Sequence, residues 1–185
     1  ESLVEASTIV VNPQDATITI DPTSKEAVSY GDYIFFSGGS ATEATTGLSS
    51  YNVKTGVLTT GISPRMEPNG GTNMILIGTD LFVALVNSST LGGYSGVIVC
   101  YDISDPANPV EKAVVAQSIT TDPETGIKSY GATHGVGHGF TTYGNMLFYH
   151  TNYGIKYVQL PVTEDTIAGA GSYEHYSGYH RISER

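Results

Sequence analysis

The chain has 185 residues and a mass of 19.5 kDa, the size of one domain of roughly 100–200 residues with enough buried surface for a core. Only 14% of its residues are charged, and its formal net charge is −10. These values exclude a charge-rich disordered chain and argue against binding to nucleic acid or to an anionic membrane surface. The 22 glycines and 13 tyrosines favour turns and strands, so we expect one all-β domain over residues 1–185.

Short apolar segments near the start predict strands at residues 8–11 and 16–20, either as a further unit or as a strap that closes a ring of units. Three later segments share one pattern, in which a glycine and a polar residue precede an apolar, aromatic run. These segments are residues 31–36, 78–83 and 144–149. Each predicts a tight turn followed by a strand.

A second strand that passes through a tyrosine is predicted after each of these segments. These strands are residues 47–53, 96–103 and 154–160. Their tyrosines, Tyr51, Tyr101 and Tyr157, follow one another at intervals of about 50 and 56 residues. A four-stranded propeller blade takes roughly 40–50 residues. The recurring pattern therefore predicts a hairpin unit that occurs three times along the chain.

A third strand follows the second in the first two units. The turn at residues 54–56 leads to residues 57–60, and the turn at residues 104–109 leads to residues 110–115. Gly56 permits a positive φ, and the prolines of the second turn interrupt a ladder of hydrogen bonds, so the chain must reverse at both places. The pattern is therefore that of antiparallel sheets.

One of these turns carries a specific motif. Residues 99–110 read Val-Cys-Tyr-Asp-Ile-Ser-Asp-Pro-Ala-Asn-Pro-Val. This segment resembles the LVIVD repeat of bacterial and archaeal surface β-propellers, and residues 51–56 and 158–161 resemble degenerate copies of it. The resemblance implies antiparallel blades in an extracytoplasmic, often scaffold-like protein, although this fold by itself assigns no reaction.

The number of units is small for a propeller. A ring usually contains roughly four to eight blades, because each twisted sheet must pack both faces against its neighbours before the ring closes. We therefore expect β-propeller blades whose ring is incomplete in this chain, or is completed by an oligomer or by another protein. The alternative is a β-sandwich, in which the same hairpins form two packed sheets.

Histidines provide one candidate for chemistry. All five lie in the last third of the chain, and His134 and His138 are four residues apart in the glycine-rich loop 130–140. Neutral imidazole is the commonest protein ligand of copper, zinc and iron. With His150 as the nearest further imidazole, the pattern predicts a metal site and an alternative function as a metal-dependent oxidoreductase subunit. In the competing interpretation, the loop histidines bond local backbone groups.

Carboxylates at two turns provide a second candidate site. Asp102 and Asp105 flank one turn, and Asp122 and Glu124 lie in another, where hard oxygen ligands suit Ca²⁺. Neither loop has the spacing of an EF-hand, and a turn-forming aspartate explains its position without an ion. We therefore expect local capping at both turns, and no cofactor is firmly implied.

The end of the chain is rich in tyrosine. Tyr173, Tyr176 and Tyr179 predict a contact surface, because tyrosine supplies a large amphipathic area and is common at interfaces. A final edge strand with one covered face is the alternative.

Several features bear on the class of protein. The single Cys100 excludes an intrachain disulfide and a two-cysteine metal motif. The uncharged stretch of residues 81–101 is broken by glycines and polar residues, so we expect no membrane span. The chain lacks a hydrolase elbow, a phosphate loop and a dinucleotide fingerprint. We therefore predict a non-enzymatic interaction or scaffold module that is extracellular, cell-surface or periplasmic and assembles with itself or with another chain.

Overall fold

The computed structural model describes residues 8–12, 15–19, 26–38, 47–62, 71–87, 95–131, 139–151 and 154–170. Every regular element within these ranges is a β-strand. The prediction of an all-β chain with antiparallel sheets is confirmed.

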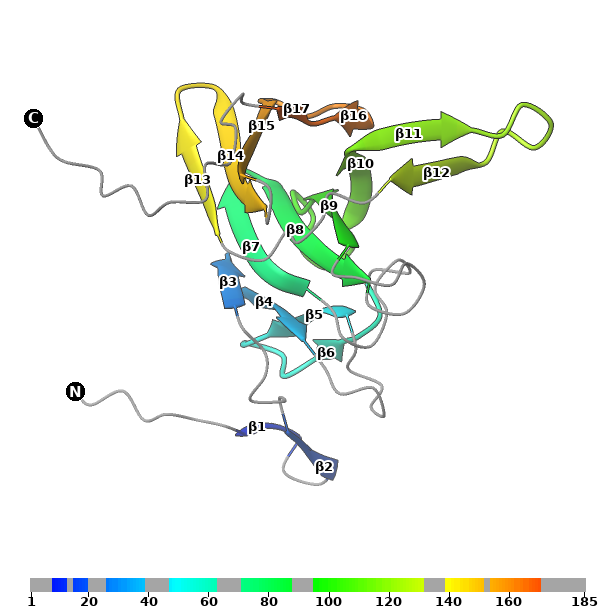
Figure 1. The fold of residues 1–185 in the computed structure, drawn as a ribbon. Coiled ribbons are helices and arrows are strands. Elements are labelled where there is room, and N and C mark those ends of the chain that lie inside the picture. The colour runs from blue at the N-terminus through cyan, green and yellow to red at the C-terminus, as the bar shows by residue number, and fades with distance from the viewer. Residues whose placement is uncertain are drawn as a thin grey trace, which may run out of the picture.

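Three sheets form the body of the described chain (Figure 1). The first sheet consists of β3 (Glu26–Tyr30), β4 (Tyr33–Gly38), β5 (Gly47–Asn52) and β6 (Leu58–Thr59). The second sheet consists of β7 (Gly71–Ile77), β8 (Asp80–Asn87), β9 (Ser95–Asp102) and β10 (Val110–Ala116), with β16 (Thr166–Ile167) paired parallel to β10. The third sheet consists of β13 (Phe140–Tyr143), β14 (Met146–Thr151), β15 (Gly154–Gln159) and β17 (Gly169–Ala170).

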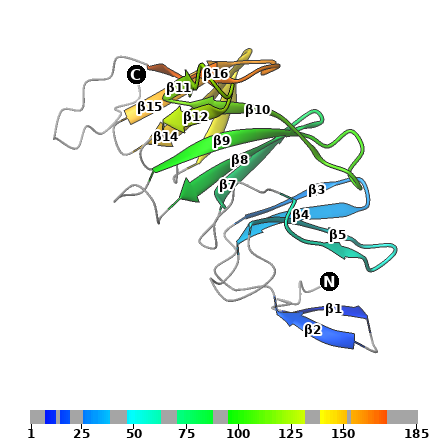
Figure 2. The same ribbon diagram turned by 90° about the vertical axis from the view of Figure 1, so that its right-hand side faces the viewer.

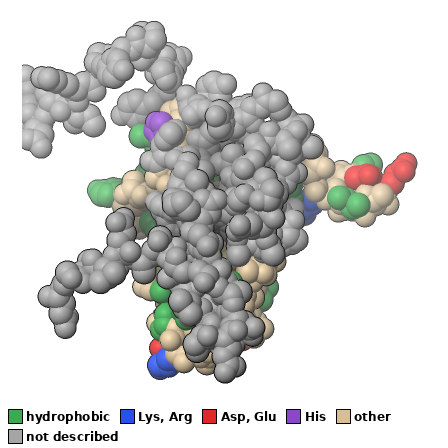
Figure 3. Space-filling view, turned by 90° about the horizontal axis from the view of Figure 1, so that it is seen from below, with side chains coloured by type: hydrophobic (Ala, Val, Ile, Leu, Met, Phe, Trp, Pro, Cys, Tyr) green, Lys and Arg blue, Asp and Glu red, His purple; other side chains and the backbone are tan. Residues whose placement is uncertain are grey.

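Two hairpins complete the described strands. The first pairs β1 (Thr8–Asn12) with β2 (Asp15–Thr19), at the strands predicted near the start of the chain. The second pairs β11 (Ser118–Thr121) with β12 (Lys128–Gly131) and projects from the body (Figure 1). Acidic and apolar side chains gather at the tip of this projecting hairpin (Figure 3).

Most strands lie where the sequence predicts them. The segments after the three glycine turns are β4, β8 and β14, and the strands that follow them are β5, β9 and β15. The predicted third strands are β6 and β10. The first strand of each sheet, β3, β7 or β13, is absent from the prediction. Each sheet therefore contains four antiparallel strands rather than two or three, and the second sheet has β16 as a fifth strand, parallel to β10.

The glycine turns have the backbone geometry that the sequence predicts. Gly31, Gly78 and Gly144 have φ values of 57°, 64° and 58°. Each opens a two-residue turn between the first and second strands of its sheet. Glycine adopts this left-handed conformation without the steric cost of a Cβ atom, which makes it suitable for such hairpins.

One backbone hydrogen bond occurs at the same place in all three sheets. The N–H groups of Val53, Ile103 and Leu160 donate to the carbonyl oxygens of the second turn residue, at 2.9, 2.9 and 2.7 Å. The accepting residues are Asp32, Thr79 and Asn145. This common bond, together with the strand register, makes it possible to match the three sheets position by position.

The matched positions correct the expectation that Tyr51, Tyr101 and Tyr157 are equivalent. Tyr51 and Tyr101 each pair with the second residue of the strand that follows the glycine turn, whereas Val158 takes this place in the third sheet. Tyr157 pairs instead with Phe148. A shift of one residue places a side chain on the opposite face of a sheet. Tyr157 is therefore not the counterpart of the other two tyrosines.

The three sheets pack face to face in three layers (Figure 2). Side chains alternate along β8, so that Leu81 and Val83 join a core with the first sheet while Phe82 and Ala84 join a core with the third. All four side chains are fully buried. The described body therefore has three layers, whereas the β-sandwich alternative requires two. Within the described ranges, no sheet closes into a barrel.

The first strands of the sheets lie close together. Both β3 and β13 contact β7, so the stack has one side where the first strands meet. The later strands, such as β6 and β10, lie farther from that side (Figure 1).

Candidate functional site

The predicted metal and interface residues fall mainly outside the described ranges. His134, His138, Tyr173, Tyr176 and Tyr179 all lie outside them. Only His150 is described, as an exposed residue of β14 whose backbone N–H donates to the carbonyl of Gly139 at 3.4 Å.

The structure does not test the predicted metal site. Among the residues that it describes, no group of three or more histidine, cysteine, aspartate or glutamate side chains is placed to hold a metal ion. Two of the three predicted ligands are not among those residues. A metal site at His134, His138 and His150 therefore stays a prediction.

The turn aspartates bond their own backbone. A carboxylate oxygen of Asp102 accepts the N–H of Ser104 at 2.8 Å, and Asp122 accepts the N–H of Glu124 at 2.8 Å. These backbone bonds lower the pKa of Asp102 and of Asp122. Asp105 similarly accepts the N–H of Ala107 at 3.1 Å. The prediction of local capping at both turns is confirmed.

A buried carboxylate connects the projecting hairpin to the body. One oxygen of Asp165 accepts the N–H of Val114 at 2.8 Å, and the other accepts Nζ of Lys128 at 2.8 Å and the hydroxyl of Tyr130 at 2.7 Å. The Asp165 side chain is 16% exposed. Burial by itself would raise the pKa of Asp165, but the bonds from Lys128, Tyr130 and Val114 outweigh it and hold the pKa below its ordinary value.

The strongest candidate for contact with another molecule is the side of the third sheet that points away from the second, here called the outer face. Leu147, Tyr149 and Val158 belong to the core shared with the second sheet, so the alternate positions point outward. The outward positions are Thr141, Tyr143, Met146, Phe148, His150, Ile155, Tyr157 and Gln159. None of these described positions carries an aspartate, glutamate, lysine or arginine.

Aromatic and aliphatic side chains dominate this outer face. Tyr143 is 82% exposed and Ile155 is 48% exposed. The rings of Phe148 and Tyr157 lie side by side, with centroids 6.0 Å apart. Tyr157 also covers Gly169 of β17, where an added Cβ atom would lie 2.7 Å from Cζ of the tyrosine ring. The outer face thus has a broad apolar surface with a close fit between neighbouring strands.

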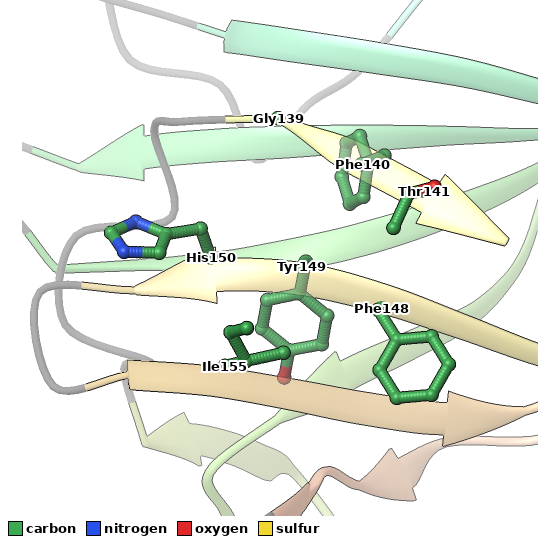
Figure 4. A pocket seen from close by; sticks show the side chains of 7 residues that line it. All are labelled: Gly139, Phe140, Thr141, Phe148, Tyr149, His150 and Ile155. Atoms are coloured by element: carbon green, nitrogen blue, oxygen red, sulfur yellow. The ribbon is translucent and has the colours of Figure 1, made fainter. Parts of the chain in front are cut away.

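A cavity of about 400 Å³ opens at one end of this face (Figure 4). It is lined by Gly139, Phe140, Thr141, Phe148, Tyr149, His150 and Ile155. Three of the lining residues, Phe140, Phe148 and Tyr149, carry aromatic rings, while His150 lies at the end of β14, apart from those rings (Figure 4). The cavity is suited to an apolar or aromatic group rather than to an ion.

The same positions are buried in the other two sheets. Phe148 corresponds to Phe35 of the first sheet and Phe82 of the second, according to the matched register. Both counterparts are 0% exposed and face the next sheet in the chain. Ile155 likewise corresponds to Leu48 and Ile98, which are 0% exposed. The outer face of the third sheet therefore has the side chains of an inter-sheet contact.

The outer face is absent from the sequence-based predictions, although the sequence carries a signal for it. In residues 146–151, the side chains that point to either side of the strand are mostly apolar or aromatic. Such a strand is typical of a sheet that is covered on both sides.

Comparisons with protein-family models, with curated proteins and with solved structures find no match to this chain. The likeness to LVIVD repeats thus rests on the sequence motif. Among the described residues, no helix has the length and hydrophobicity needed to cross a bilayer.

Proposed function

We propose that this chain is an interaction module of an extracytoplasmic β-propeller, in which the outer face of the third sheet is covered by a β-sheet from another polypeptide. The module acts as a scaffold by joining that polypeptide to its own three sheets.

The arrangement of the sheets supports the propeller part of this proposal. Three consecutive meanders are stacked face to face, and the first strand of the second sheet contacts the first strands of both neighbours. Propeller blades are four-stranded antiparallel sheets that follow one another around a central axis in the order of the chain. The recurring hydrogen bond after each third strand is the relation expected of successive copies of one unit.

The observation that carries the proposal is the outward position of Phe148. Its two counterparts are buried against the following sheet, whereas Phe148 lines an open cavity. Burying an apolar side chain of this size stabilises a contact by roughly 1.5–3 kcal/mol. A further sheet would bury Phe148, Ile155 and Tyr143 in the way that the third sheet buries Phe82.

The extracytoplasmic location rests on the resemblance of residues 99–110 to LVIVD repeats of surface propellers. The low content of charged residues, 14%, agrees with that resemblance. Fractionating the native cells and detecting the protein in each fraction tests the location independently of the proposed contact.

Thiol labelling tests the proposed contact. The native Cys100 is 0% exposed, and burial raises the pKa of its thiol to about 12, so an introduced cysteine reports alone. Ile155→Cys places the probe on the outer face, and Val57→Cys, at a position of similar exposure in the first sheet's last turn, is the matched control.

We expect both variants to react rapidly in the isolated chain at nanomolar concentration. In the native complex, Ile155→Cys should be protected at least tenfold and Val57→Cys should not be protected. Two results contradict the proposal: equal reactivity of Ile155→Cys in both states, or an unreactive Ile155→Cys in the folded, isolated chain.

A further inference from the structure

We infer that the covering sheet is the third sheet of a second copy of this chain, and that Tyr143 of each copy fills the cavity of the other. This inference rests on the proposed function, since it names the polypeptide that covers the outer face.

The lack of charged side chains at its described positions makes the outer face the place where two copies of this acidic chain can meet. The chain has a net charge of −10, so two copies repel one another over most approaches. The described positions of the outer face carry no formally charged side chain, and two such faces meet without opposed carboxylates. A basic partner would gain nothing from this neutral face and would be drawn to acidic surface elsewhere.

The face also has a projection and a recess that match one another. Tyr143 is 82% exposed and points outward at the end of β13, while the cavity of about 400 Å³ begins at Gly139, at the other end of the same strand. Four residues of a strand span about 13 Å. A two-fold axis halfway between them, near Thr141, places each Tyr143 over the cavity of the other copy.

Such an interface is closed, because the same patch is used on both copies. Tyrosine is well suited to the projecting position, since its ring packs on Phe148 and Ile155 while its hydroxyl stays at the wet rim of the cavity. The face consists of strands of two to six residues, so the interface is of the small class that gives weak association. We therefore expect a dissociation constant in the micromolar range.

Sedimentation equilibrium of the purified chain, from about 1 to 500 μM, tests this inference. We expect a monomer–dimer equilibrium that Tyr143→Ser weakens at least tenfold and that Ile155→Lys abolishes. Val110→Ser, at an apolar position that is 61% exposed on the second sheet, is the control and should dimerise like the unaltered chain. Far-ultraviolet circular dichroism and melting curves establish that each variant is folded.

Thr141→Cys tests the two-fold geometry directly. A residue near the axis faces its own counterpart across two packed sheets, whose backbones lie about 10 Å apart, so a bifunctional maleimide of that span should yield a cross-linked dimer. A cysteine at Val57 should give none.

The possible outcomes separate this inference from the proposed function. A chain that stays monomeric at 500 μM, or a dimer indifferent to Tyr143→Ser and without the Thr141→Cys link, overturns the second-copy inference. If Ile155→Cys is nevertheless protected in the native complex, the proposed function stands and the covering sheet belongs to a different protein. If Ile155→Cys is unprotected there as well, both fail.

Discussion

Replacing Asp165 by asparagine should destabilise the protein by about 2 kcal/mol at neutral pH. The asparagine carbonyl can still accept the N–H of Val114, but an amide nitrogen replaces the oxygen that accepts the hydroxyl of Tyr130 and Nζ of Lys128. A hydrogen bond to a charged group contributes roughly 1.5–3 kcal/mol, and Tyr130 is partly buried. The exposed Lys128 adds little, because solvent screens its ion pair.

The pH dependence of stability provides a second signature of the same bonds. The pKa of Asp165 in the folded chain lies below its ordinary value of 3.8. A carboxyl group with a lowered pKa stabilises the folded state fully above its unfolded pKa, and the contribution disappears as the pH falls through the folded pKa. The difference in free energy of unfolding between the unaltered chain and Asp165→Asn should therefore be constant from pH 7 to about pH 5 and shrink below pH 4.

Urea denaturation measured at intervals from pH 7 to pH 3 checks both expectations. Glu164→Gln is the matched control, because Glu164 is an exposed neighbouring carboxylate, and its bond from the Thr166 hydroxyl goes to its backbone carbonyl, which the substitution keeps. A cost of Asp165→Asn below about 0.5 kcal/mol at pH 7, or the same cost at pH 3 as at pH 7, would contradict this role of the Asp165 carboxylate.

Three further changes distinguish the contributions of the stacked sheets. Phe82→Ala should cost roughly 3–5 kcal/mol in urea denaturation, and Phe148→Ala less than half as much in the monomer; equal costs would mean that the outer face is already covered. Tyr149→Phe should raise the melting temperature, because the buried Tyr149 hydroxyl has no hydrogen-bond partner among the described residues and an unsatisfied polar group costs about 1–3 kcal/mol; a lower melting temperature would show that the hydroxyl is bonded. Gly169→Ala should displace the Tyr157 ring and cost roughly 1–3 kcal/mol, with an altered near-ultraviolet circular dichroism spectrum; an unchanged spectrum contradicts the close contact.

The sequence predicted the strands that follow a glycine turn because two local signals coincide there. Gly31, Gly78 and Gly144 supply the positive φ of the turn, and the aromatic runs behind them have strong strand preference. The first strands of the sheets lack this coincidence. Segments such as β3 and β13 are short, with only four or five residues, and alternation over so few residues is ambiguous.

The candidate site was less predictable because it depends on contacts between distant residues. Asp165 bonds Val114 across 51 residues and Tyr130 across 35, and no local pattern indicates such pairs. The face on which Tyr157 lies likewise depends on strand register, which the spacing of tyrosines along the chain does not determine. Composition and periodicity therefore predict that the strands form sheets. The outer face of the third sheet can be identified only once the pairing of its strands is known.

The parallel pairing of β16 with β10 has a consequence for how the protein folds. The second sheet acquires this edge strand from a segment that follows β15 in the chain, and Ala168 then donates its N–H to the carbonyl of Ala116. A nascent chain emerging from the ribosome thus exposes β10 until the residues beyond the third sheet have been synthesised. The same segment supplies β16 to the second sheet and β17 to the third. Because one short piece of chain completes both sheets, the second and third layers should melt in one cooperative step.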